Sequence, residues 1–359
     1  MPIKEIIAKS LDGEELSLEE GITLFESKDI ITLGEGAAKL AAQKHTDNIV
    51  TYIVDRNINY TNVCESKCLF CAFYKDEEGE GGYIISKDEL AAKIIETKEL
   101  GGIQILLQGG LNKALKIEFY EDLLKFIKSF DTHIHAFSPP EIAFIAQNSG
   151  LSVYDLLTRL KEAGLGSIPG GGAEILVDEI RGEISPGKCS SGEWLDIMEE
   201  AHKLGLRTTA TMMYGHIETY AQRVEHLLKL RKLQARTEGF TAFIPWSFQE
   251  KNSKLASSGS SGFDYLKTVA VSRLILNNFD NLQASWVTQG GKVAQIALLF
   301  GANDMGSTMI EENVVAAAGV ANTITEEEIR GIIKEAGFIP SRRNTFYKKM
   351  AHRVLVWVK

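Results

Sequence analysis

The segment TYIVDRNINYTNVCESKCLFCAFYK (51–75) joins a predicted β-strand to a loop that holds three of the four cysteines. Residues 51–57 are rich in apolar and β-branched side chains, which is typical of a buried strand. Cys64, Cys68 and Cys71 follow within eight residues of one another. Loops at the carboxyl ends of barrel strands carry active sites, so this segment indicates a reactive loop at the first strand of the fold.

Downstream of this segment, apolar runs alternate with amphipathic segments. We predict strands over 103–108, 133–137, 166–168, 206–213, 240–245, 282–286 and 303–308. We predict helices over 87–100, 117–129, 152–163, 192–204, 220–236, 264–277 and 291–299. Eight such alternations indicate an α/β fold, a (βα)8 TIM-type barrel. Without its last two strands it would be a partly open barrel of six.

The chain divides into a short extension and the barrel. Residues 1–48 lack strand signals and contain amphipathic stretches over 17–27 and 35–45, so we expect a helical N-terminal extension. Residues 49–359 form the barrel domain with its C-terminal strands. The SSGSSG stretch (257–262) indicates a flexible loop within that domain.

Composition and charge exclude several classes of protein. The 359 residues are 44% apolar and 24% charged, which is typical of a globular chain and not of a disordered one. The net charge of −9 argues against nucleic-acid binding, which needs a basic surface. No apolar run approaches the roughly 20 residues that span a bilayer, and the amino terminus lacks a secretory signal. We expect a cytoplasmic protein with a small-molecule substrate, whose acidic runs 76–80 and 326–328 are solvated.

The spacing Cys-x3-Cys-x2-Cys indicates a metal centre. Zinc prefers four protein ligands in structural sites, and no fourth Cys or His lies at a matching spacing. Three thiolates on a [4Fe–4S] cluster would leave one iron open to another ligand. A zinc loop or three unrelated core cysteines are the alternatives, and Cys189 is expected to be a free buried thiol.

This spacing, with Phe70 before the last cysteine and a strand ahead of the loop, resembles the radical S-adenosylmethionine (SAM) enzymes. The resemblance implies that SAM binds the open iron and that an electron from a donor such as flavodoxin or ferredoxin cleaves it to a 5′-deoxyadenosyl radical. It also implies the residues that contact SAM. These are Phe70, Tyr74, Gly109, Gly110, Ser138, Glu174, Arg181, Met213 and Glu218.

Two of these elements depart from the family pattern. Gly109 and Gly110 stand where the family has Gly-Gly-Glu, but Leu111 replaces the acid, so only the backbone role carries over. The stretch 211–218 resembles Gly-x-Ile-x-Gly-x-x-Glu, with Thr211 in place of the first glycine. Ser138 could instead be a helix N-cap, and Glu174 and Arg181 could lie on a solvated helix face.

Longer stretches resemble one subgroup of these enzymes. HAFSPPEI, LGSIPGGGAEIL, TTATMMYGHIET, FTAFIPWSFQ and the run from QASWVTQGG to GSTMIEENV are similar to the cyclic dehypoxanthinyl futalosine synthases of menaquinone biosynthesis. The resemblance covers about residues 50–345. Aminofutalosine synthases and the enzymes of the F420 chromophore remain alternatives, as does a non-catalytic iron–sulfur scaffold.

The resemblance implies a radical cyclisation. The 5′-deoxyadenosyl radical would abstract hydrogen from C4′ of the ribose of dehypoxanthine futalosine. The carbon radical would add to the attached benzoate ring, and loss of one electron and one proton would restore the aromatic ring. This reaction needs a dry pocket and a base.

Residues near the strand ends are candidates for these roles. The candidate substrate contacts are Trp246, Phe248, Gln249, Asn252, Ser285, Trp286, Gln289 and Asn303. His216, Asp304 and Glu311 are the candidate bases, and Arg56, Arg207 and Arg342 are candidates for the substrate carboxylate. His133 and His135 lie on one predicted strand, and we expect one of them to face the barrel interior.

Overall fold

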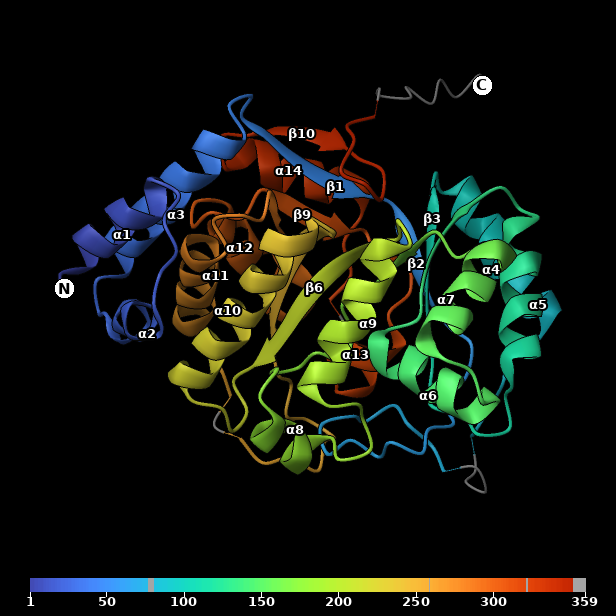
Figure 1. Ribbon diagram of the computed structural model, residues 1–359. Helices are drawn as coiled ribbons and strands as arrows, with labels where there is room; N and C mark the ends of the chain where they lie inside the picture. The colour runs from blue at the N-terminus through green and yellow to red at the C-terminus, as the bar shows by residue number, and fades with distance from the viewer. Residues whose placement is uncertain (77–80, 258, 321, 351–359) are drawn as a thin grey trace, which may run out of the picture.

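The computed structural model describes residues 1–76, 81–257, 259–320 and 322–350. Its centre is a seven-stranded parallel sheet with the order β2-β3-β4-β5-β6-β7-β8 (Figure 1). These strands are β2 (Asp55–Asn59), β3 (Gln104–Gln108), β4 (His133–Ala136), β5 (Ser167–Ile168), β6 (Arg207–Tyr214), β7 (Phe240–Ser247) and β8 (Asn281–Leu282). A second sheet has the order β10-β1-β9, from β10 (Ile339–Arg342), β1 (Ile49–Ile53) and β9 (Asp304–Ser307).

Strand β9 joins the two edges of the curled sheet. On one side, a parallel bridge connects Gln283, just after β8, to Asp304. On the other side, β9 pairs with β1, which runs through Val54 into β2. The N–H groups of Thr308 and Ile310 continue this edge by donating to the carbonyls of Ile53 (3.0 Å) and Asp55 (3.2 Å). The prediction of an α/β TIM-type barrel is confirmed.

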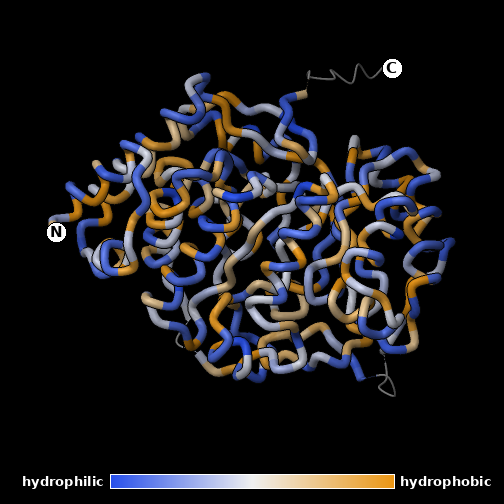
Figure 2. Tube along the Cα trace, viewed as in Figure 1, coloured by the Kyte–Doolittle hydropathy of each residue, from blue (hydrophilic) through white to orange (hydrophobic). Residues whose placement is uncertain are grey.

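Nine helices in the described part of the chain follow the barrel strands. They are α4 (Lys87–Glu99), α5 (Ile117–Lys128), α6 (Pro139–Ser149), α7 (Val153–Ala163), α8 (Asp178–Ile184), α9 (Ser191–Lys203), α10 (Tyr220–Thr237), α11 (Gly262–Ile275) and α12 (Trp286–Leu298). Hydrophobic and hydrophilic residues are mixed along the helices (Figure 2), as expected for helices that pack one face on a sheet. Helix α11 differs, because α3 covers it and residues 268–275 are all buried.

The sequence analysis missed two of these helices and misplaced one strand. Helix α6 begins at a capping box in which Ser138 and Glu141 bond each other's backbone N–H groups, a pattern that the SPPE stretch already carries. Helix α8 has only seven residues, too few for a clear amphipathic period. The predicted strand 282–286 is wrong beyond Leu282, because Trp286 begins α12.

Three helices precede the barrel: α1 (Ile3–Leu11), α2 (Leu18–Glu26) and α3 (Ile30–Lys44). They lie against α10 and α11 (Figure 1). The Ser10 hydroxyl donates to the Leu274 carbonyl (2.7 Å), and the Phe25 ring stacks on Tyr220 with centroids 5.1 Å apart. The stretch predicted over 17–27 matches α2, whereas α3 begins earlier than expected and α1 was not expected.

The C-terminal part adds α13 (Asn313–Ala317), α14 (Glu326–Glu335) and β10. Glu326 forms an ion pair with Arg342 and accepts a hydrogen bond from the Tyr52 hydroxyl (2.7 Å), so it is only partly exposed. Glu327 and Glu328 are exposed, as predicted. Of the other acidic run, residues 77–80 lie outside the described part of the chain.

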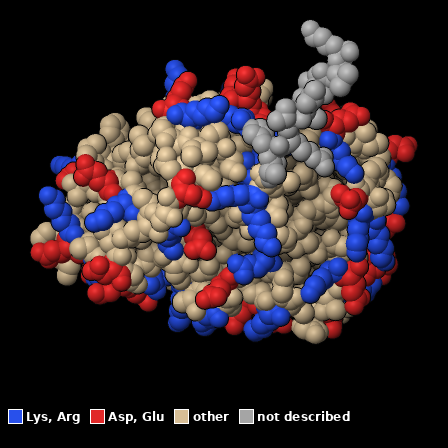
Figure 3. Space-filling model, turned by 90° about the horizontal axis from the view of Figure 1, so that it is seen from above, with Lys and Arg blue, Asp and Glu red and all other residues tan. Residues whose placement is uncertain are grey.

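The surface carries both signs of charge. Basic and acidic side chains are interspersed on the face in Figure 3. Among the described residues, no helix is long and apolar enough to cross a bilayer.

Candidate active site

The cysteine loop is held against the ends of neighbouring strands. The N–H of Cys64 donates to the Lys75 carbonyl (3.2 Å), and the N–H of Cys71 donates to the Cys68 carbonyl (3.1 Å). Cys68 is buried, whereas Cys64 and Cys71 are partly exposed. At Gly110 a Cβ would lie 2.1 Å from the Val63 carbonyl oxygen. Only glycine allows this close approach between the end of β3 and the loop.

The chemistry of these donors fits an iron–sulfur cluster. All three thiols are free, and they come from one loop. Among the described residues, no three His, Cys, Asp or Glu side chains gather closely enough to hold a single metal ion. A four-iron cube spreads its thiolate ligands more widely than one ion does, so Cys64, Cys68 and Cys71 would hold it as three sulfur ligands. When bound, such a cluster supplies single electrons.

A buried carboxylate fixes the turn after β3. Glu141 accepts hydrogen bonds from the N–H of Gly109 (3.0 Å) and the Tyr60 hydroxyl (2.8 Å) through one oxygen. Its other oxygen accepts from the Ser138 N–H (2.8 Å) and hydroxyl (2.6 Å). Ser138 is therefore the N-cap of α6. The sequence analysis missed Glu141, although its capping-box spacing was visible.

Glu174 is paired with a lysine that the sequence analysis missed. Glu174 is buried at a positive φ of 40°, and its carboxylate lies 2.5 Å from Lys188 Nζ. The same ammonium lies 5.0 Å from the centre of the Phe70 ring. Burial raises the pKa of the Cys68 thiol, and the nearby Lys188 ammonium lowers it by a smaller amount. A cation and a carboxylate thus face the cysteine loop, not a solvated helix face.

Arg181 is hydrogen-bonded to the backbone around it. Its guanidinium donates to the carbonyls of Ala173 (2.7 Å), Gly172 (3.1 Å) and Cys189 (2.5 Å). These bonds connect the glycine-rich loop to the turn before α9. The predicted contact of Arg181 with SAM stays a prediction. The ammonium of Lys188, the other cation near the glycine-rich loop, is hydrogen-bonded to Glu174.

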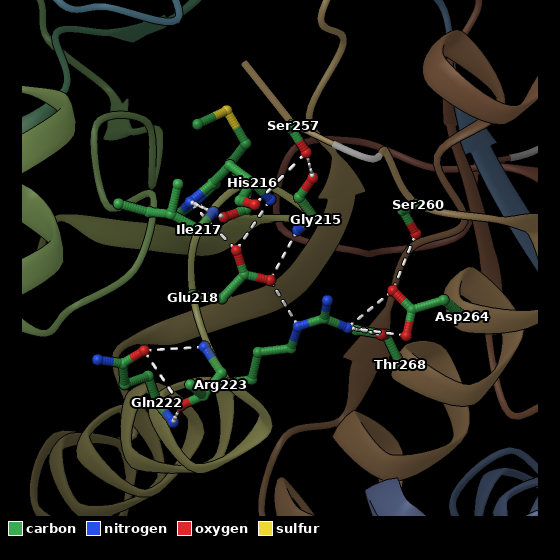
Figure 4. Close-up of polar contacts among 12 residues, drawn as sticks. Gly215, His216, Ile217, Glu218, Gln222, Arg223, Ser257, Ser260, Asp264 and Thr268 are labelled. Carbon is green, nitrogen blue, oxygen red and sulfur yellow. Dashed lines mark hydrogen bonds and ion pairs between the residues drawn. The ribbon is translucent and has the colours of Figure 1, made fainter. Parts of the chain in front are cut away.

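The turn after β6 is organised by Glu218 (Figure 4). Its carboxylate accepts from the N–H groups of Gly215 (2.7 Å) and His216 (2.9 Å) and from Arg223 Nε (2.7 Å). Met213, which precedes the turn, is buried and donates its N–H to the Glu174 carbonyl (3.1 Å). Glu218 thus shapes the turn from inside.

Two aromatic residues of the cysteine loop complete the predicted SAM contacts. Phe70 is partly buried under Lys188. The Tyr74 hydroxyl accepts a hydrogen bond from Lys254 Nζ (2.5 Å). The roles of all nine predicted SAM contacts stay predictions.

A cavity of about 290 Å³ lies inside the barrel. Trp246 and Trp286 form an aromatic wall, and Gln108 and Gly171 line the cavity beside the glycine turns. The other polar lining residues are mainly neutral. They include Asn57, Gln104, Thr209, Thr211, Gln283, Ser285 and Thr288. Such a lining suits a molecule with both an aromatic part and a hydroxylated part.

The floor of the cavity comes from the C-terminal segment after β10. Arg343, Thr345 and Tyr347 all line the cavity. Arg343 pairs with Asp304 through two nitrogens, at 2.5 and 2.9 Å, and its guanidinium lies 3.8 Å from the centre of the Tyr347 ring. Thr345 donates to Gln104 Oε1 (2.5 Å). No local motif marked this segment, so the sequence analysis missed it.

Three of the eight predicted substrate contacts line the cavity: Trp246, Ser285 and Trp286. Gln249 and Gln289 do not line it, and both donate to the Ser247 hydroxyl. The remaining three lie elsewhere: Phe248 is buried against His216, Asn252 donates to the Ala317 carbonyl, and Asn303 is buried between Arg273 and Asn281.

None of the three predicted bases lines the cavity. The His216 side chain is fully enclosed, and its Nδ1 accepts from the Ile217 N–H (2.8 Å). Burial lowers its pKa. Asp304 forms an ion pair with Arg343. Glu311 pairs with Lys93 Nζ (2.7 Å). Their catalytic roles stay predictions that this geometry does not favour.

The titratable groups that do line the cavity are different ones. Asp55, His135, Glu312, Arg343 and Tyr347 line it among the described residues. His135 thus meets the expectation that a histidine of β4 faces the interior. His133, two residues earlier, lies on the same face of the strand and bonds the same Ser167 hydroxyl. Of the predicted carboxylate partners, Arg56 and Arg342 are paired with Glu96 and Glu326, and Arg207 is exposed.

Solved structures share this fold. The hydrogenase maturase HydG from Carboxydothermus hydrogenoformans superimposes with a TM-score of 0.75 at 17% identity, over 96% of this chain and 80% of that one. Methylornithine synthase (PylB) superimposes with a TM-score of 0.70 at 16% identity, over 94% of this chain and 97% of that one.

Sequence relatives are closer. A cyclic dehypoxanthine futalosine synthase from Halalkalibacterium halodurans is 44% identical over 97% of this chain and 95% of its own length. A 5-amino-6-(D-ribitylamino)uracil–L-tyrosine 4-hydroxyphenyl transferase from Methanocaldococcus jannaschii is 44% identical over 93% of this chain and 97% of its own. Residues 58–230 match the radical SAM superfamily, and residues 237–354 match the CofH/MqnC C-terminal region. The chain therefore belongs to the radical SAM superfamily of enzymes, in the family that carries the CofH/MqnC C-terminal region.

Proposed function

We propose that this enzyme cyclises dehypoxanthine futalosine to cyclic dehypoxanthinyl futalosine by means of a 5′-deoxyadenosyl radical. The observation that carries the proposal is the cavity between the glycine turns and the Arg343 floor. Its volume of about 290 Å³ lies at the lower end of the range for small-molecule sites. This size favours one substrate that reacts with itself over two substrates that must be joined.

The cavity also suggests how the substrate lies. The ribose, which must meet the adenosyl radical, would lie at the rim beside Gln108 and Asn57, whose side chains can bind hydroxyl groups. The benzoate ring would pack against Trp246 and Trp286. Its carboxylate would point to Arg343, the one cation among the described lining residues. Arg343 Nη1 bonds only the Asn344 carbonyl, at 3.2 Å.

The walls would also protect the radicals. Trp286 is 2% exposed, and its indole N–H is bonded to the Ser307 carbonyl (2.9 Å). Side chains held in this way exclude water and hold the benzoate close to C4′, which favours ring closure over side reactions.

The experiment compares the substrates named for the two kinds of relative. Anaerobically reconstituted protein receives SAM and dithionite, with dehypoxanthine futalosine in one tube and 5-amino-6-(D-ribitylamino)uracil plus tyrosine in another. A third tube holds the enol-ether substrate of aminofutalosine synthase. We expect 5′-deoxyadenosine and a cyclised product in the first tube only. A 4-hydroxyphenyl adduct in the second tube, or an adenosyl adduct in the third, would contradict the proposal.

A further inference from the structure

Two histidines of β4 share one hydroxyl group inside the barrel. The Ser167 Oγ lies 2.7 Å from His135 Nδ1 and 2.8 Å from His133 Nε2. A hydroxyl has one proton, so it can donate to only one of the two rings and must accept from the other. The three side chains therefore form a chain of hydrogen bonds with a direction.

The two ends of this chain lie in different surroundings. His135 is buried and lines the cavity, and because Ser167 takes its Nδ1, its Nε2 remains for a group in the cavity. His133 is the first residue of β4 and is only half-buried. Its ring packs edge-on against Phe346, with centroids 5.2 Å apart. The chain thus leads from the cavity toward the outer end of the strand.

Both rings are in the protonation state that a proton relay needs. Burial lowers the pKa of His135 to about 3 and that of His133 to about 4. The nearby Arg343 guanidinium also lowers the pKa of His135, though less than burial does. At pH 7 each imidazole is therefore neutral, with one N–H and one lone pair.

We propose that His135, Ser167 and His133 form a proton relay from the cavity to the outer end of β4. A proton from the substrate binds His135 Nε2, and the Nδ1 proton moves to Ser167 Oγ. The hydroxyl proton moves to His133 Nε2, and the Nδ1 proton of His133 leaves to water. This relay rests on the proposed function, whose last step releases one proton, while the accompanying electron goes to a one-electron acceptor of the iron–sulfur class.

The other proton acceptors that line the cavity are not connected to a second titratable ring. Asp55 accepts hydrogen bonds from Ser307 and Gln104, and burial raises its pKa. Glu312 accepts from Asn57 Nδ2 (2.8 Å) and caps the short helix α13 through its other oxygen. Among the described lining residues, only His135 is hydrogen-bonded through a hydroxyl to a second titratable ring.

The test separates the first chemical step from the last. Ser167→Ala removes the middle of the relay but leaves both histidines and the cysteine loop. We expect 5′-deoxyadenosine formation within about twofold of wild type, and about 10- to 100-fold less cyclised product per 5′-deoxyadenosine. A substrate radical should accumulate in electron paramagnetic resonance spectra. Ser167→Thr keeps a hydroxyl and should restore much of the product ratio.

The chain offers a matched control. His202 also lies between two hydroxyls, at 2.8 Å from both Thr208 and Thr237, and burial lowers its pKa to about 4. It does not line the cavity, so His202→Gln should keep the wild-type product ratio.

Three results would overturn the relay. One is a wild-type product ratio in Ser167→Ala. Another is an equal loss of 5′-deoxyadenosine and product together with a lowered melting temperature, because that result indicates a structural role for Ser167. A wild-type enzyme that cleaves SAM but forms no cyclised product would contradict the proposed function itself, and the relay with it.

Discussion

The rim and the floor of the barrel are built in opposite ways. At the rim, the reactive residues come from short contiguous motifs, such as the cysteines of residues 64–71 and the turn 215–218. At the floor, Asp304 and Arg343 come from distant parts of the chain and bind each other. The thiols of the cysteine loop are free, whereas Asp304 and Arg343 form a buried ion pair. Asp304, although ionisable and near a strand end, is bound by Arg343 and does not line the cavity.

The largest effect is expected at the rim. Replacing Cys64, Cys68 or Cys71 with Ala should abolish 5′-deoxyadenosine formation, because a cluster with two thiolates is not held correctly. The measurement is 5′-deoxyadenosine by mass spectrometry after anaerobic reconstitution. Cys189→Ala is the matched control, since burial raises the pKa of that thiol to about 11 and keeps it protonated. Full activity in a variant of the loop would contradict the cluster assignment.

At the floor, breaking the buried pair should unfold the protein more easily. Arg343→Met leaves Asp304 charged in a site where its residue is 0% exposed. We expect a loss of about 3–5 kcal/mol in the free energy of unfolding, measured with urea. The more exposed pair of Arg236 and Glu199 is the control, and Arg236→Ala should cost about 0–1 kcal/mol. Equal costs for the two variants would refute the structural role of the floor.

A smaller effect is expected where the rim depends on a buried support. Glu141→Gln keeps the size of the side chain but puts an NH2 group opposite hydrogen-bond donors. We expect a loss of about 1–3 kcal/mol in stability and weaker SAM binding, because the Gly109 turn loosens. Glu121→Gln is the control, because Glu121 is a partly buried carboxylate of α5 that pairs with Arg159. Unchanged SAM affinity in Glu141→Gln would show that the turn does not depend on this carboxylate.

The last prediction concerns the pH dependence of stability. Burial lowers the pKa of His226 to about 3, and its Nδ1 accepts from the Leu176 N–H (3.0 Å). Below about pH 6.5 the unfolded chain binds a proton that the folded chain does not, so this residue lowers stability as the pH falls toward 3.

Replacing His226 tests this sign. Compared with wild type, His226→Gln should lose less stability on acidification from pH 6.5 to 4, by about 1.4 kcal/mol per pH unit. Urea unfolding at several pH values measures the difference, and other titrating groups cancel in it. Parallel stability curves for the two proteins would contradict the neutral state of His226.

The sequence predicted the barrel and the cysteine loop because both depend on local patterns. Alternating apolar runs mark strands and helices, and Cys-x3-Cys-x2-Cys marks the loop within eight residues. The prediction that SAM is a cofactor came from the resemblance to a known family. The strand predicted over 51–57 was harder to delimit, because β1 and β2 follow each other directly in the sequence but belong to two sheets.

The sequence could not identify the partners of individual polar groups. Lys188 meets Glu174 across a loop, and Arg343 meets Asp304 across 39 residues. The Ser167 hydroxyl binds the two histidines of β4 because β4 and β5 are neighbours, with His135 in register with Ser167. Such contacts depend on strand register, which no local pattern contains. For this reason the predicted bases were chosen from ionisable residues near the strand ends in the sequence, and His135 was not among them.

The central claim is that hydrogen abstraction and ring closure occur within one substrate in this cavity. The most direct measurement uses dehypoxanthine futalosine labelled with deuterium at ribose C4′, together with SAM and the reduced protein. We predict that 5′-deoxyadenosine gains one deuterium and that the cyclised product loses it. Unlabelled 5′-deoxyadenosine together with a product that retains the deuterium would contradict the claim.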